Sequence, residues 1–293
     1  MPTYPTPAPI AVTLEADFAE VQIVASDRSD TVVDVRPTDP DEHTHVQVAE
    51  ATRVELIGDQ LRVFAPKPSL MARILNSPCL DIVISLPTGS AVRAELGAGN
   101  IAATGTLGSC SAHTGAGNIR LADTGALDAR SGTGDIIVGN VTGDATIRTP
   151  AGHTQISSAT GSVTIKNGSS GPRIGRVGGD LSVRAGHGRI EAESVSGNLD
   201  ARTAHGAVVI GVATGDEIDL KTSHGDLEVG IPDGRAVWLD LDTKYGRVAS
   251  EFVPTGQEPT EARSVRVVGR TSYGDIRIRR LSATPDADGD PRP

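Results

Sequence analysis

The chain has 293 residues, a net charge of −10 and only three Phe, three Tyr and one Trp. So few rings exclude an aromatic core and predict a narrow interior of Val, Ile, Leu and Ala. Apart from Arg277, Arg279 and Arg280, Lys and Arg form no local run, which argues against a nucleic-acid or anionic-membrane surface. Two cysteines make neither a disulfide framework nor a metal knuckle.

The first ten residues, MPTYPTPAPI, have neither the basic nor the apolar region of a signal peptide. No stretch approaches eighteen apolar residues, so no transmembrane segment is expected. We therefore expect residues 1–10 to be disordered and the protein to be cytoplasmic. A cell-surface location would require export by an unrecognised route.

Residues 11–90 are interpreted as irregular N-terminal coils of the repeat that follows. Alternating apolar and polar residues predict strands at 11–23, 31–35, 54–64 and 80–86. Acidic loops such as 39–42 separate them, and residues 70–75 are expected to form one helical turn.

Residues 91–250 carry a regular repeat that is marked by glycine. One series recurs every eighteen residues: Gly125, Gly143, Gly161, Gly179, Gly197 and Gly215. A second series lies half a period away: Gly99, Gly117, Gly134, Gly152, Gly188, Gly206 and Gly225. Apolar residues follow most of these glycines at the second and fourth positions, as Val163 and Ile165 follow Gly161. One extra residue between Gly206 and Gly225 explains why the pattern of both series shifts by one position there.

Each half-unit therefore reads as a tight turn and a short, half-buried strand. Asp residues directly after the glycines, such as Asp144 and Asp180, are expected to cap exposed backbone groups. Two such strands cannot bury their apolar faces singly, but stacked coils can pair in parallel ladders about 4.8 Å apart. The sequence thus predicts an all-β, right-handed parallel β-solenoid with about 18 residues and two short strands per coil. A left-handed hexapeptide helix is disfavoured because the apolar pairs recur about every nine residues.

Residues 251–281 are expected to hold a polar loop, over 252–262, and a final coil that includes 274–278. Residues 282–293 are rich in Asp, Pro and Gly and are expected to form a disordered tail. No linker divides the chain into independent domains.

Several segments resemble a bacterial family of β-strand-repeat proteins that are named as putative adhesins and have no known function. Leu86-Pro87-Thr88-Gly89 and iterated Gly-[Asp/Asn]-[Ile/Leu] strands carry the resemblance, best at 131–136, 222–227 and 271–276. It covers roughly residues 11–281. The resemblance implies a right-handed β-helix and a surface or envelope role.

One column of residues is a candidate partner-binding site. His187, His205 and His224 precede glycines in consecutive coils, and Tyr245 and Tyr273 follow in the same column. We expect these rings to stack as a ladder on one corner, where they would suit contact with a sugar or polymer. Metal binding is disfavoured because zinc ligands must converge, whereas stacked rings point the same way.

Other chemistry finds less support in the sequence. Gly132–Asp135 is similar to the calcium-binding β-roll nonapeptide, but Ile136 stands where that motif has its inward carboxylate. The many acidic residues are interpreted as a solvated face, without the converging pair that glycoside hydrolysis needs. Cys110 is interpreted as a small buried hydrophobe. No cofactor is expected.

The leading hypothesis is a non-enzymatic scaffold whose rigid face binds a macromolecule, either a protein or a polysaccharide. One alternative is a bactofilin-like structural protein that self-associates through its terminal coils. The acidic N-terminal loops and the Arg279-Arg280 pair are candidate caps against such association. The other alternative is a carbohydrate-active enzyme on the same β-helix.

Overall fold

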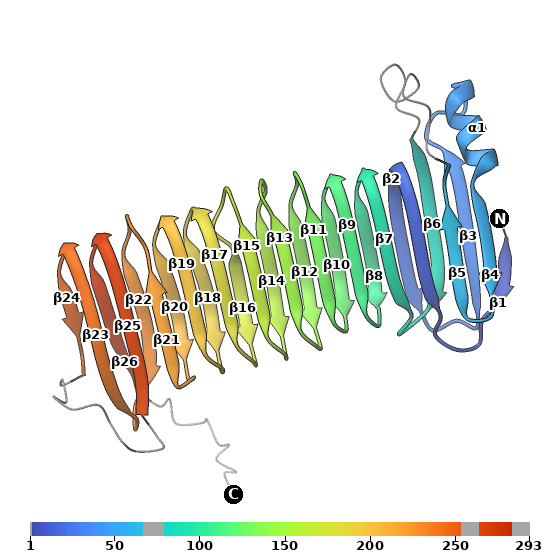
Figure 1. Ribbon diagram of the computed structural model, residues 1–293. Coiled ribbons are helices and arrows are strands. Elements are labelled where there is room, and N and C mark those ends of the chain that lie inside the picture. Colours follow the sequence, from blue (N-terminus) through green and yellow to red (C-terminus); the bar gives the residue numbers. More distant parts are fainter. Residues whose placement is uncertain (1, 67–78, 253–263, 283–293) are drawn as a thin grey trace, which may run out of the picture.

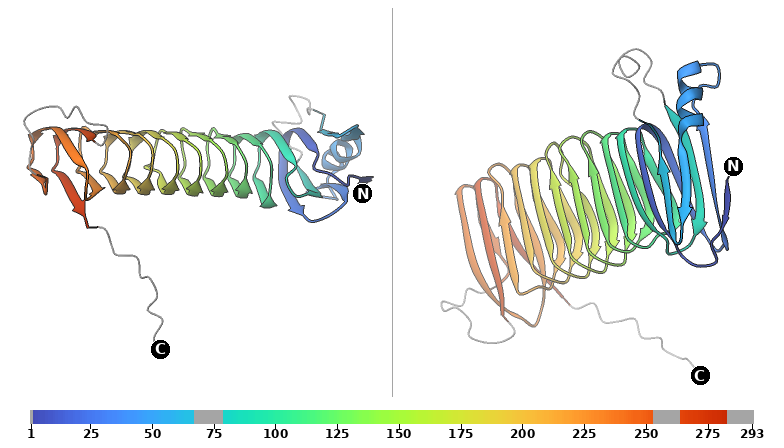
Figure 2. Two further views of the ribbon diagram at one scale, coloured as in Figure 1. Left: turned by 90° about the horizontal axis from the view of Figure 1, so that it is seen from below. Right: turned by 45° about the vertical axis from the view of Figure 1, so that its right-hand side comes forward.

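A computed structural model describes residues 2–66, 79–252 and 264–282. It shows a straight rod of stacked rungs, in which each regular rung is one strand of sheet B followed by one strand of sheet A (Figures 1 and 2). The expected helical turn at 70–75, nearly all of the loop at 252–262 and nearly all of the tail at 282–293 lie outside the described residues.

Strand β2 (Ala11–Ser26) contributes its first half to sheet B and its second half to sheet A. Sheet B also contains β4 (Arg53–Ile57), β5 (Gln60–Phe64), β7 (Ala91–Ala98), β9 (Cys110–Ala116), β11 (Leu127–Ser131), β13 (Ala145–Thr149), β15 (Val163–Asn167), β17 (Leu181–His187), β19 (Leu199–His205), β21 (Glu217–Lys221), β23 (Ala236–Tyr245) and β25 (Ser264–Tyr273). Sheet A also contains β1 (Thr3–Pro5), β3 (Asp30–Pro37), β6 (Leu80–Pro87), β8 (Ile101–Thr106), β10 (Ile119–Thr124), β12 (Ile136–Val141), β14 (Thr154–Ala159), β16 (Arg173–Val177), β18 (Ile190–Val195), β20 (Val208–Ala213), β22 (Leu227–Pro232), β24 (Val248–Ser250) and β26 (Ile276–Leu281).

The ladders between regular rungs are parallel and in register, which confirms the β-solenoid. Leu181 lies opposite Leu199, 18 positions later in the chain, and Leu199 lies opposite Ile218, 19 positions later. The change from 18 to 19 is the extra residue inferred from the glycine series. Asp side chains link the rungs as expected: Asp144 Oδ1 accepts the N–H of Ser162 at 2.8 Å, and Asp180 Oδ1 accepts that of Asn198 at 2.7 Å.

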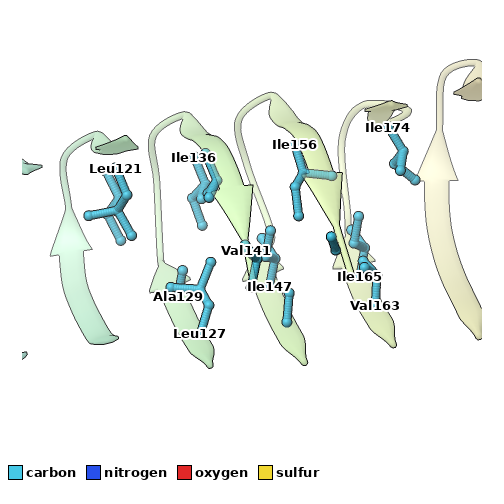
Figure 3. Packing of buried hydrophobic residues seen from close by; sticks show 14 of the residues in the cluster. Leu121, Leu127, Ala129, Ile136, Val141, Ile147, Ile156, Val163, Ile165 and Ile174 are labelled. Atoms are coloured by element: carbon cyan, nitrogen blue, oxygen red, sulfur yellow. The ribbon is translucent and has the colours of Figure 1, made fainter. Parts of the chain in front are cut away.

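The core is a narrow layer of aliphatic side chains between the two sheets. Figure 3 shows Ile136 and Ile156 of sheet A and Ile147 and Ile165 of sheet B directed into this layer. Cys110 is also buried there, and its burial raises the pKa of its thiol to about 12. These residues confirm the predicted interior, because alternate positions on each strand face inward.

The order of strands in space differs from their order in the chain at both ends of the rod. Near the C-terminal end, β25 and β26 lie between the β21–β22 rung and the β23–β24 rung. Near the N-terminal end, β2 lies between the β5–β6 rung and the β7–β8 rung. Arg279 and Arg280, the proposed cap, are on β26, beyond the three residues of that strand that pair with β24. Arg279 pairs with Glu228 at 2.9 Å, and the role of the two arginines as a cap stays a prediction.

The N-terminal end is closed by antiparallel strands, and it corrects two expectations. Residues 1–10 are not wholly disordered, because β1 pairs antiparallel with β3 and so satisfies backbone groups at its edge. The Tyr4 hydroxyl also donates to the carbonyl of Val54 at 3.0 Å. The predicted strand 54–64 is instead the antiparallel pair β4–β5, with a turn at Gly58, whose φ is 64°.

One helix was missed by the sequence analysis. Helix α1 (His43–Ala51) follows the acidic segment 39–42 beside the N-terminal end (Figure 1). It has no buried residue, so it lacks the broad apolar stripe from which helices are predicted. No helix in the described part of the chain is long and apolar enough to span a membrane.

Candidate functional site

The predicted ring column is a continuous stack, which we call the aromatic ladder. Its order in space is His187, His205, His224, Tyr273 and Tyr245. The ring centroids lie 5.3, 4.9, 4.9 and 4.8 Å apart, and no pair of planes diverges by more than 11°. Tyr273 precedes Tyr245 because β25 is inserted between β21 and β23.

Backbone and hydroxyl contacts between rungs position these rings. The glycine after each of His205, His224 and Tyr273 has a positive φ of 139–149°, which turns the chain from sheet B towards sheet A. The N–H of Gly206 donates to the carbonyl of His224 at 2.7 Å, and the buried Thr222 hydroxyl donates to the carbonyl of Gly206 at 2.9 Å. The ring spacing is thus the rung spacing, set by hydrogen bonds beneath it.

The aromatic ladder exposes ring edges rather than ring faces. Both faces of His205, His224 and Tyr273 are covered by neighbouring rings. In the aromatic ladder, only the end rings His187 and Tyr245 have a face without a ring partner. The ladder therefore offers a row of imidazole and phenol edges for hydrogen bonding, and stacking of a sugar on a ring face is restricted to its two ends.

A row of cations that the sequence analysis missed runs along sheet B, and we call it the cationic stripe. Its members face outward and lie directly opposite one another on adjacent strands: Arg130, Arg148, Lys166, Arg184, Arg202, Lys221 and Arg270. In chain order these cations are far apart, so no run is visible. The expectation that basic residues are not clustered is wrong for this face. The signal was present, because five of the cations stand five residues after a glycine of the first series.

A second outward row lies two residues before the cationic stripe on each of its strands except β25, and we call it the polar column. It consists of Asp128, Thr146, Thr164, Ser182, Asp200 and Asp219. Within the described residues, these carboxylates pair with some cations and leave others free. Asp128 pairs with Arg130 at 2.7 Å, and Asp200 pairs with Arg184 at 2.8 Å and with Arg202 at 2.7 Å.

Three cations of the stripe, Arg148, Lys166 and Lys221, form no ion pair with any described residue, and all three are exposed. Arg270 is different, because its hydrogen bond to Asp240 raises the pKa of its guanidinium above the ordinary value. The stripe ends at an acidic position on one side and at a histidine followed by an acidic position on the other. Asp242 lies opposite Arg270, and beyond Arg130 come His113 and then Glu95.

The outer face of sheet B is hollowed along the polar column. One hollow of about 450 Å³ is lined by residues that include Ser182, Asp200, Asp219 and Arg266. A second, of about 470 Å³, lies towards the N-terminal end and includes Asp128 and Thr146. Sheet B thus presents a hollowed polar column, the cationic stripe and, along the later rungs, the aromatic ladder as parallel rows.

The described residues contain no group of three or more His, Cys, Asp or Glu side chains that could hold a metal ion. Ile136, at the position of the inward carboxylate in the calcium β-roll, is fully buried in the aliphatic core. The rows on the outer face of sheet B are therefore taken as the candidate site.

One protein-family model covers most of this chain. The family model described as Toastrack DUF4097 matches residues 11–284. No curated protein matches the chain. Among solved structures, a putative adhesin from Bacteroides fragilis is 11% identical, with 94% of this chain and 95% of that chain covered and a TM-score of 0.38.

Two further solved structures come from Parabacteroides. A putative adhesin from Parabacteroides merdae is 9% identical, with 96% of this chain and 95% of that chain covered and a TM-score of 0.31. A putative lipid binding protein from Parabacteroides distasonis is 9% identical, with the same coverages and a TM-score of 0.30.

Proposed function

This chain belongs to the Toastrack family DUF4097, and on that premise we propose that it is a non-enzymatic β-solenoid scaffold that holds a macromolecular partner against the outer face of sheet B. The observation that carries the proposal is the in-register cationic stripe beside the polar column. Its outermost members are six rung spacings apart, or about 29 Å. That length suits an extended macromolecule better than a small molecule.

A parallel ladder is a favourable platform for such a partner. Each strand in the middle of the rod is hydrogen-bonded to a rung on both sides, so the backbone beneath the charges is fixed before binding. Binding to a pre-organised surface loses less conformational entropy than binding to mobile loops. Repeat proteins commonly bind partners on such extended faces.

The geometry supports binding over catalysis. Asp200 and Asp219 lie on the same face, but both are engaged by the Arg202 guanidinium, at 2.7 and 2.9 Å. Carboxylates held in this way fix the orientation of a cation. A general acid or base would instead need to reach the reacting group of a substrate.

The test is to block one face at a time. Lys166→Cys on sheet B and Gln155→Cys on sheet A, each combined with Cys79→Ser, provide exposed thiols for a polyethylene glycol maleimide. Polymers and proteins from the native envelope are then offered to the immobilised protein. We expect the block at position 166 to abolish capture of the partner that the unblocked protein retains, and the block at position 155 to leave it unchanged.

Two results would contradict the proposal. Equal capture after both blocks would remove the site from sheet B. Chemical processing of the captured partner, measured by chromatography of the released material, would favour the carbohydrate-active enzyme.

A further inference from the structure

We infer that the cationic stripe binds a linear acidic polysaccharide, lying along the rod axis with its carboxylates on the stripe and its hydroxyls on the polar column. This inference rests on the proposed function and names the class of partner. The charge pattern of the stripe is unfavourable for the isolated fold. Like charges directly opposite one another on adjacent strands destabilise a sheet.

The repulsion is greatest where no carboxylate intervenes. Arg148 and Lys166 lie opposite each other on β13 and β15, and the polar column beside them supplies only Thr146 and Thr164. A bound anion would relieve this repulsion, and the two threonine hydroxyls can donate to the same ligand. This pair of rungs is therefore the centre of the inferred site.

The shape of the cationic stripe favours a narrow polymer over a flat membrane surface as the ligand. The cations form a row one side chain wide, and the adjacent row contains Asp128, Asp200 and Asp219. An anionic membrane would approach both rows together, so its head groups would meet these carboxylates as well as the cations. A narrow polymer can lie along the stripe alone.

The charge density selects a polymer with widely spaced charges. Seven cations less the three carboxylates of the polar column, and less Asp240, which pairs with Arg270, leave a net charge of +3. Duplex DNA carries one charge per about 1.7 Å, or about 17 charges over this length. Single strands also need ring faces on which bases can stack, and the aromatic ladder covers its inner faces.

The polar column fits a ligand that is rich in hydroxyl groups. Its carboxylates accept hydrogen bonds, and its Thr and Ser hydroxyls both donate and accept them. A polymer with only anionic groups would be repelled by Asp200 and Asp219. An acidic polysaccharide has uncharged hydroxyls between its carboxylates, so it can use both rows.

The experiment uses the full chain and polygalacturonate, an unbranched polyuronate, in isothermal titration at several salt concentrations. The test variant is Arg148→Ser with Lys166→Ser. The matched control is Arg120→Ser with Arg176→Ser, which removes two exposed cations from sheet A. We expect the test variant to bind at least about tenfold more weakly and with a shallower salt dependence, because two charge-assisted contacts are lost. The control should change the affinity less than about twofold.

Parallel arms distinguish the other partners. Methyl-esterified polygalacturonate keeps the sugar chain and loses the charge, while poly(dT), polyglutamate and phosphatidylglycerol vesicles keep the charge without the sugar. The inference is overturned by undiminished binding of the ester, by tighter binding of any non-sugar polyanion, or by no binding of polygalacturonate. In the last case, capture that still depends on the block at position 166 would leave the proposed function standing.

Discussion

The two glycine series require glycine for different physical reasons. In the second series φ is positive, as at Gly206 (139°) and Gly225 (148°), where side chains other than hydrogen are strained. In the first series φ lies outside that region, and close packing of the rungs excludes a side chain. A Cβ at Gly161 would lie 2.6 Å from the carbonyl carbon of Gly143. The sequence predicts both sets of turns, but the two causes become visible only in the structure.

At the residue scale, Gly225→Ala tests how firmly a corner is fixed. Its φ is 148° and its Cβ would lie 2.2 Å from the carbonyl oxygen of Gly206. We expect the free energy of unfolding to fall by more than about 3 kcal/mol, since the strain adds to a backbone clash. Gly234→Ala is the control, with a φ of 89° and no atom within 4 Å of its Cβ, and should cost about 1 kcal/mol. Urea denaturation followed by circular dichroism measures both, and equal losses would contradict the argument.

At the scale of elements, local patterns predicted the strands better than their partners. The segment 11–23 is confirmed within β2, and 80–86 within β6, because alternation over a few residues reports which side is buried. Pairing depends on residues far apart in the chain. Nothing local to β25 indicates that it inserts between β21 and β23, so the order of Tyr245 and Tyr273 could not be derived.

The candidate site was predicted in part for the same reason. Consecutive coils place His187, His205 and His224 in one column, and the sequence therefore predicted that they stack. The cationic stripe follows the same eighteen-residue rule and was open to prediction. It was missed because charge was assessed along the chain, whereas the repeat brings Arg148 and Lys166 side by side.

Cysteine pairs test the inserted order of these strands. Lys221 and Arg270 are opposite partners on β21 and β25, while Asp242 lies opposite Arg270 on the far side. In a Cys79→Ser background, we expect Lys221→Cys with Arg270→Cys to be joined by dibromobimane, because adjacent rungs are about 4.8 Å apart. Lys221→Cys with Asp242→Cys is the matched control and should stay unjoined, at about twice that separation. Fluorescence of the bridged product reports the result, and the reverse order of yields would show that rungs follow chain order.

At the scale of the whole molecule, net charge is a poor guide to surface chemistry. The chain carries −10 overall, yet one face of the rod bears seven consecutive cations, with acidic positions at Glu95 and Asp242 beyond them. A rigid rod keeps such a face separate from the acidic remainder of the surface. Because salt screens charges over about 8 Å at physiological ionic strength, the acidic remainder of the surface does not cancel the potential of the cationic face.

The two ends of the rod determine whether it can polymerise. Among the described residues, β23 and β24 at the C-terminal end each pair on one side only, and both run parallel to the rungs. At the other end, the edge strand of sheet B is β4, which is antiparallel to β5. The edge strand of sheet A is β1, which is antiparallel to β3, itself antiparallel to β6. In a head-to-tail joint, β23 would pair antiparallel with β4 in sheet B, while β24 would pair parallel with β1 in sheet A. Regular rungs pair parallel in both sheets.

We therefore expect assembly to stop at two copies, since the exposed edge of β23 can pair with its own copy about a two-fold axis but cannot continue. Size exclusion with light scattering at rising concentration should show no species larger than a dimer, and electron microscopy should show rods of constant length. Val248→Lys, at the exposed C-terminal edge, should lower any dimer fraction, while Ile57→Lys, also exposed but at the other end, should leave it unchanged. Filaments that lengthen with concentration would instead identify the bactofilin-like structural protein.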